Sequence, residues 1–199
     1  LQKTDKPVED LAKEFINPDK EVHTVEEAIA GAKDIIAENI SDEADYRIWI
    51  RKITMQKGRV ISAAKDEKAE SVYEMYYDFE EPVGRLAGHR ILALNRGEKE
   101  KFLTVKIEAP EEDIIRYLQK KTIHGENPYT TPILKDVTED SYKRLIAPAI
   151  EREIRSELTE RAEDGAIEVF KKNLEQLLMQ PPIVGQTVLG WDPAFRTGC

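Results

Sequence analysis

Residues 138–179 read TEDSYKRLIAPAIEREIRSELTERAEDGAIEVFKKNLEQLLM, and they carry the clearest helical pattern of the chain. Apolar side chains recur along it at spacings of three and four residues, which is typical of an amphipathic helix. The recurring residues are Tyr142, Leu145, Ile146, Ala149, Ile150, Ile154, Leu158, Ala162, Ile167, Phe170, Leu174, Leu177 and Leu178. Pro148 lacks a backbone donor and crowds the preceding turn, and Gly165 weakens the middle of the stretch. We therefore predict a long helical region that is kinked or broken at both residues.

The charged side chains of this stretch are spaced for pairing within one helix. Glu151 and Arg155 lie four residues apart. Glu157 and Arg161 repeat this spacing, so we expect two ion pairs along the solvent-exposed face. Ile154 lies on the apolar stripe, and we expect its side chain to be buried in the core.

The N-terminal part of the chain carries ordinary helix start signals. Thr24 and Glu27 have the spacing of a capping box ahead of an apolar run, which predicts a helix that begins at residue 25. Ser41 or Asp42 would cap a following helix that ends at Gly58. We expect these two helices to form an antiparallel pair on a tight turn.

Shorter elements complete the predicted fold. Residues 7–16 favour a first short helix with Phe15 on its buried stripe. Residues 59–65 and 101–109 favour strands, the second by strict alternation, and together they predict a hairpin or ribbon. Two more helices are predicted, over residues 88–97 and 111–123. The expected fold class is mainly α, a multi-helix scaffold with a long kinked C-terminal helical region and a small β hairpin or ribbon.

A cluster of large side chains precedes Pro82, between the two predicted strands. Its members are Tyr73, Met75, Tyr76, Tyr77 and Phe79. Aromatic rings of this kind can stack on the bases of single-stranded nucleic acid. Four acidic residues are interleaved with them, namely Glu74, Asp78, Glu80 and Glu81. Because these carboxylates repel phosphates, we favour a packing role under a loop.

The overall composition excludes several classes of protein. The formal net charge is −9, so nucleic-acid binding by this chain alone would require a local basic patch. No apolar run is long enough to span a membrane and no signal-like segment is present, so we expect no membrane association. Cys199 is the single cysteine, which permits no internal disulfide and fits a cytoplasmic location.

Two stretches resemble one known family. GHRILALNRGEKE (residues 88–100) and TERAEDGAIEVFKKNLEQLLMQPP (residues 159–182), which leads into VLGWDPAFRTGC (residues 188–199), are similar to the bacterial Tex family. These are transcription accessory proteins that bind RNA, in which a helical region precedes a YqgF-type domain of the ribonuclease H-like fold, helix-hairpin-helix modules and an RNA-binding barrel. The resemblance implies that residues 1–180 are the helical scaffold with its small β insert. It implies that residues 186–199 are the truncated first strand and loop of the YqgF-like domain.

This reading makes the chain a fragment of a longer protein, with a strand that lacks its sheet. A lone strand is not stable in water. The apolar side chains of the strand are Val188, Leu189 and Trp191. We expect them to pack near Leu178, or to pair with an exposed strand edge such as residues 102–107. Pairing of this second kind between two chains would give a dimer as an artefact of the truncation.

Asp192 is the one candidate for metal chemistry. It resembles the strand-one carboxylate that holds Mg²⁺ in active ribonuclease H-like nucleases. Two-metal hydrolysis needs several convergent carboxylates, which a single acid at the end of one strand does not supply. We therefore predict no catalytic residue and no metal site in this chain, with Asp192 a candidate only in the intact parent domain. The plainer alternative is that Asp192 caps a local turn.

His89, Arg90 and Arg96 are candidate nucleic-acid contacts. They lie in or next to the helix predicted over residues 88–97, and they would bind phosphates if they faced outward together. The alternative, which we favour, is a helix held by local ion pairs with Arg96 near its negative end. No spacing among the histidines or the cysteine favours a metal, and no phosphate-binding glycine loop is present, so we predict no cofactor.

These observations predict a non-catalytic helical scaffold fragment of a Tex-like RNA-binding transcription accessory protein, and not an enzyme. RNA would bind through modules of the parent that lie outside this chain, and the transcription machinery is a candidate partner. Two alternatives stay open. One is a fragment of a metal-dependent RNase H-like nuclease, and the other is a generic helical protein-interaction module.

Overall fold

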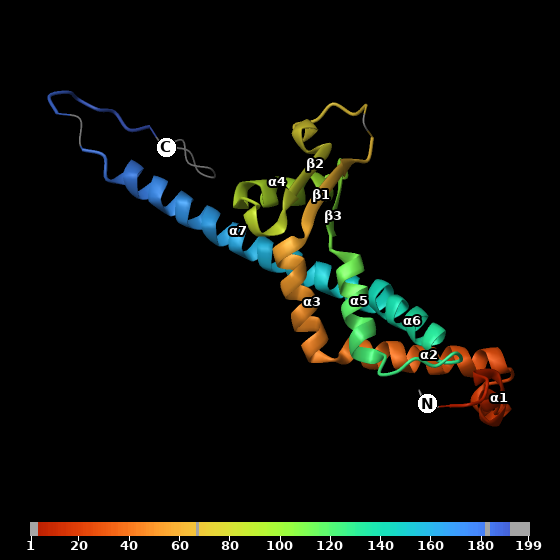
Figure 1. Cartoon of the computed structure of the whole chain (residues 1–199). Helices are drawn as coiled ribbons and strands as arrows, with labels where there is room; N and C mark the ends of the chain where they lie inside the picture. Colours follow the sequence, from red (N-terminus) through yellow and green to blue (C-terminus); the bar gives the residue numbers. More distant parts are fainter. Residues whose placement is uncertain (1–3, 67, 182–183, 192–199) are drawn as a thin grey trace.

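The structure is a computed structural model that describes residues 4–66, 68–181 and 184–191. It confirms a mainly helical fold with a small sheet and a long helix toward the C-terminus (Figure 1). The helices are α1 (Val8–Ala12), α2 (Val25–Asp42), α3 (Ala44–Lys57), α4 (Gly88–Lys99), α5 (Glu111–Thr122), α6 (Thr131–Asp140) and α7 (Ala147–Leu178), with a π-helical turn η5 (Ser141–Ile146) between the last two. The strands are β1 (Arg59–Ala64), β2 (Asp78–Pro82) and β3 (Leu103–Glu108).

The capping box predicted at the start of α2 is confirmed. The Thr24 side chain accepts a hydrogen bond from the Glu27 backbone N–H, and the Glu27 carboxylate accepts one from the Thr24 N–H, both at 3.2 Å. The cap predicted at Ser41 or Asp42 is wrong, because α2 continues through both residues. Glu43 occupies the N-cap of α3 and makes no side-chain capping bond.

Two further predictions about the N-terminal helices are wrong. α2 and α3 meet at a corner (Figure 1), and α2 packs instead against α6 and η5. The buried Ser141 hydroxyl of η5 stabilises this contact, because it donates a hydrogen bond to the Ala37 carbonyl at 2.7 Å.

The predicted burial of Phe15 is the second. Phe15 is 71% exposed, because α1 already ends at Ala12 and Phe15 lies in a 3₁₀ turn. An apolar stripe this short does not determine which other element of the fold covers it.

The β element has three strands rather than two. β1 is central and pairs antiparallel with both neighbours, so that Ser62 lies opposite Phe79 of β2 and Val105 of β3. The two predicted strands are β1 and β3. β2 was missed because its sequence, DFEEP, is acidic and ends in proline, a composition that strands usually avoid. An edge strand tolerates such residues, since one of its sides needs no partner.

The first half of α7 anchors the hydrophobic core. Its buried side chains are Ile150, Ile154, Leu158 and Ala162, and the helix packs against α3 and α4. The predicted burial of Ile154 is confirmed, with none of its surface exposed. From residue 163 onward every described side chain of α7 is exposed, and the helix projects from the body (Figure 1).

Pro148 and Gly165 were both expected to interrupt the C-terminal helical region, and their effects on it differ. Immediately before Pro148 the chain forms the π-helical turn η5, in which the Ala147 N–H donates to the Tyr142 carbonyl five residues back. A π-helical turn is wider than an α-helical turn. It therefore accommodates the proline ring and the absence of a backbone N–H at Pro148. At Gly165 the alternative of a break is excluded, because α7 is one continuous helix from Ala147 to Leu178. A single glycine costs helix stability without forcing a change of geometry.

The packing expected of the C-terminal segment within this chain is not seen where the structure describes it, and pairing between two chains stays a prediction. Residues 184–191 form no strand, and Val188, Leu189 and Trp191 are all exposed. They are packed neither against Leu178, which is itself exposed, nor along the edge of β3. Asp192, the candidate metal ligand, and Cys199 lie outside the described residues.

Candidate nucleic-acid interface

α4 carries the three residues proposed to contact nucleic acid. It connects β2 to β3 and lies along α7, and it begins after Ala87 without a side-chain cap. Its close approach to α7 depends on Gly88, where a Cβ would lie 3.3 Å from the Ala162 Cα. His89 and Arg96 are exposed, whereas Arg90 is only partly exposed. The helix therefore presents these side chains in different surroundings.

Arg90 is engaged within the fold. Its guanidinium donates to the Glu81 carboxylate at 2.5 Å and lies 6.0 Å from the centre of the Phe79 ring. His89 and Arg96 are seven residues apart, which places them on one side of α4, with Arg90 turned away by about 100° at 3.6 residues per turn. The structure thus groups two of the three residues. Their contact with nucleic acid stays a prediction.

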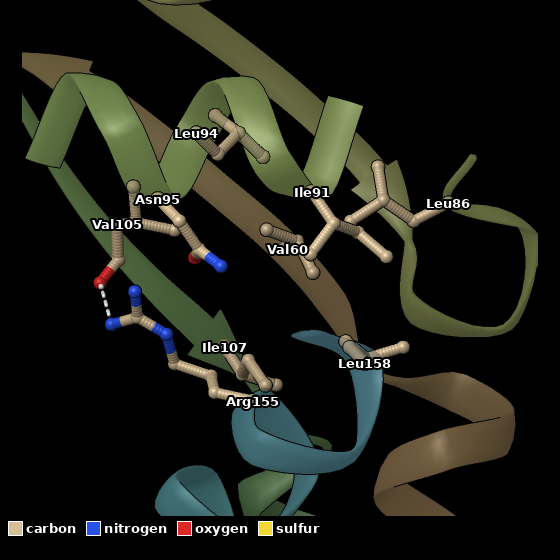
Figure 2. A pocket seen from close by; sticks show the side chains of 9 residues that line it. All are labelled: Val60, Leu86, Ile91, Leu94, Asn95, Val105, Ile107, Arg155 and Leu158. Atoms are coloured by element: carbon tan, nitrogen blue, oxygen red, sulfur yellow. Dashed lines mark hydrogen bonds between the residues drawn. The ribbon is translucent and has the colours of Figure 1, made fainter. Parts of the chain in front are cut away.

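The opposite side of α4 faces the core. Ile91 and Leu94 of α4 line a cavity together with Val60 of β1 and Leu158 of α7 (Figure 2). The cavity among these side chains has a volume of about 20 Å³. That is room for about one water molecule, so this site does not accommodate a substrate or a nucleotide.

Arg155 joins three elements at the edge of this cavity. Its guanidinium donates to both carboxylate oxygens of Glu98 on α4 and, at 3.3 Å, to the Val105 carbonyl on β3 (Figure 2). The hydrogen bond from Arg155 is the main reason that the pKa of Glu98 lies below its usual value, and this outweighs the opposing effect of burial. Close by, the Asn95 amide donates to the Thr159 hydroxyl at 2.8 Å. These bonds fix the position of α4 on α7.

The ion pairs predicted along α7 are replaced by contacts with other elements. Glu151 accepts a hydrogen bond from the Ile107 N–H at 3.0 Å, while its expected partner Arg155 pairs with Glu98. Glu157 pairs with Arg51 of α3, and one turn earlier Glu153 pairs with Arg47 at 2.7 Å. The spacing predicted that these charged side chains would pair along the solvent-exposed face of α7. In the structure they connect α7 to neighbouring elements instead.

The aromatic cluster before Pro82 contributes to the core, as predicted. Tyr73 and Tyr76 are buried, and the Tyr73 hydroxyl donates to the Glu100 carboxylate at 2.9 Å. The Tyr76 carbonyl accepts a hydrogen bond from the buried Ser62 hydroxyl of β1. Met75 differs from the rest, because it is exposed. The structure supports packing by these rings and offers no open face for base stacking at Tyr73 or Tyr76.

A second basic and aromatic surface, which the sequence analysis missed, lies between α3 and α5. Trp49 and Tyr117 stack with their ring centres 3.8 Å apart and their planes 10° from parallel. A shallow groove of about 250 Å³ beside them is lined by Lys57, Arg116 and Lys120. Lys57 pairs with an aspartate of α5, and the other two are exposed. The spacing of Arg116, Tyr117 and Lys120 along one helix was the only available signal, because Trp49 joins them through tertiary packing.

The described residues contain no group of three or more histidine, cysteine, aspartate or glutamate side chains placed to hold a metal ion. His23 and His89 are both exposed, the first in the segment before α2 and the second in α4. Within the same described ranges, no helix is both long enough and apolar enough to cross a bilayer.

Comparison with known proteins places the chain in a family. The model of the Tex central region-like family matches residues 2–170. The protein YdcI of Bacillus subtilis (strain 168) is 55% identical over 191 residues, which cover 94% of this chain and 27% of that protein. The protein tex of Bordetella pertussis is 32% identical over 95% of this chain and 26% of its own length.

A human protein named S1 RNA-binding domain-containing protein 1 is also similar, at 31% identity over 98% of this chain and 21% of its own length. The chain therefore spans about a quarter of the length of the relatives it matches. The match to the family model covers α1 through most of α7, including the sheet. The chain belongs to the Tex central region-like family.

Proposed function

We propose that this chain is a cytoplasmic, non-catalytic scaffold within a Tex-like transcription accessory protein, and that RNA binds to parts of that protein outside these residues. The observation that carries the proposal is the shape of α7. Its first half is fixed in the core, and its second half presents a row of exposed apolar side chains. Such a helix can hold a second body at a defined distance from the first. A relative in Neisseria gonorrhoeae, 27% identical over 96% of this chain, is named transcriptional accessory protein Tex, and the name of the human relative refers to an S1 RNA-binding domain. Both names support this setting.

The remaining part of the proposal concerns residues 186–199. We propose that they begin a YqgF-like domain of the ribonuclease H-like fold, on the basis of their resemblance to that family. The exposed side chains of Val188, Leu189 and Trp191 support this view, since the first strand of a sheet would bury them against neighbouring strands. The rival function, a metal-dependent nuclease, rests on Asp192. Magnesium-dependent cleavage of single-stranded RNA by the 199-residue chain, abolished by Asp192→Ala, would establish that rival.

RNA binding provides the first test. The chain is acidic overall, so we expect it to bind a fluorescein-labelled single-stranded RNA more weakly than about 1 µM at 150 mM salt. Full-length YdcI should bind the same RNA at least tenfold more tightly in an anisotropy titration. Sub-micromolar binding by the 199-residue chain would contradict the proposal, and the variants Arg116→Glu and Arg96→Glu would then show whether the α3–α5 groove or α4 is responsible.

The scaffold role has a separate test in the longer relative. Glutamate placed in YdcI at the two positions aligned with Phe170 and Leu174 should release whatever covers the second half of α7. We expect a larger radius of gyration in small-angle scattering and faster proteolysis after α7. A matched control carries glutamine at the position aligned with Glu168. If the double variant stays as compact as the control, α7 serves a separate partner protein, and the interaction-module alternative is the better description.

A further inference from the structure

A second concave site lies beside the first turns of α7, and nothing in the proposed function uses it. It has a volume of about 390 Å³ and forms where α3, the end of β3, the start of α5, η5 and the start of α7 meet. Its floor is apolar and includes Ile50 and Ile150, both almost fully buried. A pocket of this size accommodates one extended side chain or a small organic molecule.

Thr54 is the unusual residue of this pocket. It is 2% exposed, and its hydroxyl has no hydrogen-bond partner among the described residues. A buried hydroxyl without a partner costs about 1–3 kcal/mol, so buried hydroxyls nearly always have one. Because Thr54 lines the pocket, its hydroxyl is the candidate partner for a donor bound there.

The other polar groups of the pocket are acceptors of hydrogen bonds or are already paired. Glu151 uses one carboxylate oxygen to accept from the Ile107 N–H, and its second oxygen has no partner among the described residues. Lys143 is held by Glu111 at 3.1 Å and by Glu139 at 2.6 Å. With Glu108 also present, three carboxylates and one ammonium line the pocket, which gives it a formal charge of −2.

Tyr142 completes the polar lining. Burial, and secondarily the negative charge of Glu111, raise the pKa of its hydroxyl to about 12. The hydroxyl therefore stays protonated at neutral pH, and its oxygen can accept a hydrogen bond from a ligand.

We propose that this pocket binds an alkyl-ammonium or alkyl-guanidinium group. Nitrogen donors would satisfy the Thr54 hydroxyl and the free oxygen of Glu151, and the negative lining would compensate the ligand charge. The alkyl stem would lie on the apolar floor, as the stems of lysine and arginine do elsewhere. The group can belong to a lysine or arginine of a polypeptide or to a free amine, and both share this chemistry.

The test is a ¹³C-methyl NMR titration of the isoleucines with butylammonium chloride, against sodium chloride at equal ionic strength. We expect saturable shifts of the Ile50 and Ile150 methyl groups, and at least tenfold weaker binding of butanol, which lacks the charge. Glu151→Gln keeps an acceptor for the Ile107 N–H and removes only the charge, and it should weaken butylammonium binding about tenfold. Glu112→Gln, the same charge change on the first turn of α5 but outside the pocket lining, should leave it within twofold.

The variant Thr54→Val distinguishes a role of the Thr54 hydroxyl in binding from a purely structural role. Because it removes an unsatisfied buried hydroxyl, the melting temperature should hold or rise, while butylammonium affinity should fall severalfold. Comparing acetyl-lysine-methylamide with putrescine then separates a polypeptide ligand from a free amine. The proposal is wrong if butanol shifts the same methyl groups as strongly as butylammonium, or if Glu151→Gln and Thr54→Val both bind butylammonium as tightly as the parent.

Discussion

The two halves of α7 carry the same apolar spacing and meet opposite surroundings. Ile154 has none of its surface exposed, whereas Phe170, on the same helix, is 67% exposed. The first half is covered by α3, α4 and the sheet, and the second half extends beyond all of them. Helical periodicity therefore shows that a face is available for burial, and it does not show what covers that face.

The largest expected effect is the difference between one charge placed in each half. Ile154→Asp should lower the free energy of unfolding by about 4 kcal/mol, because it buries a carboxylate without a partner. Phe170→Asp should change it by no more than about 0.5 kcal/mol, because the side chain is exposed. Urea denaturation of both variants measures the difference. Equal losses would mean that the second half of α7 is covered in solution, for instance in a dimer.

Two glycine-to-alanine substitutions, one in the core and one in the second half of α7, should change stability by intermediate amounts. At Gly97 of α4 a new Cβ would lie 2.6 Å from the Leu103 Cδ1, in the part of the core next to the sheet. Gly97→Ala should therefore cost about 1–2 kcal/mol, even after the gain in helix propensity.

At Gly165 in the second half of α7, no atom of the described residues lies within 4 Å of the position where a Cβ would be. Gly165→Ala should stabilise the chain by up to about 1 kcal/mol, because the helix gains propensity at no steric cost. Thermal unfolding monitored by circular dichroism at 222 nm compares the two variants. A stabilising Gly97→Ala would show that Leu103 moves freely, which contradicts a tightly packed core at that point.

The smallest effect concerns pH and the Arg155–Glu98 pair. Because Arg155 lowers the pKa of folded Glu98 below its unfolded value of about 4.3, the pair stabilises the fold above that pH, and the contribution is lost as the pH falls through the folded pKa. Glu98→Gln should cost about 1 kcal/mol at pH 7, since the pair is partly exposed, and progressively less as the pH falls toward 3.

The matched control for this prediction lies in the second half of α7. Glu168 is 3.9 Å from Lys171, and both side chains are largely exposed. Glu168→Gln should leave stability unchanged at every pH from 3 to 7. Urea midpoints across this range measure both variants. A Glu98→Gln penalty that persists undiminished at pH 3 would mean that the carboxylate acts through packing rather than through its charge.

Local rules made several features of this protein predictable from the sequence. The capping box of Thr24 and Glu27, the long helical region and the alternating strand that became β3 all depend on residues within a few positions of one another. The burial of Ile154 followed from the same periodicity. The candidate contacts His89, Arg90 and Arg96 were placed correctly near one helix, but their relative directions required the structure.

Only the tertiary structure decided which groups meet across long distances in the chain. Arg155 pairs with Glu98, 57 positions away, instead of Glu151 four positions away, and Glu157 pairs with Arg51 across 106 positions. The acidic strand β2 exists because β1 offers an edge, which no property of the sequence DFEEP foretells. The stacking of Trp49 on Tyr117 and the pocket around Thr54 arise in the same way. The physical reason is range: caps and periodicity act within about a turn of helix, whereas ion pairs, strand edges and pockets depend on how whole elements pack.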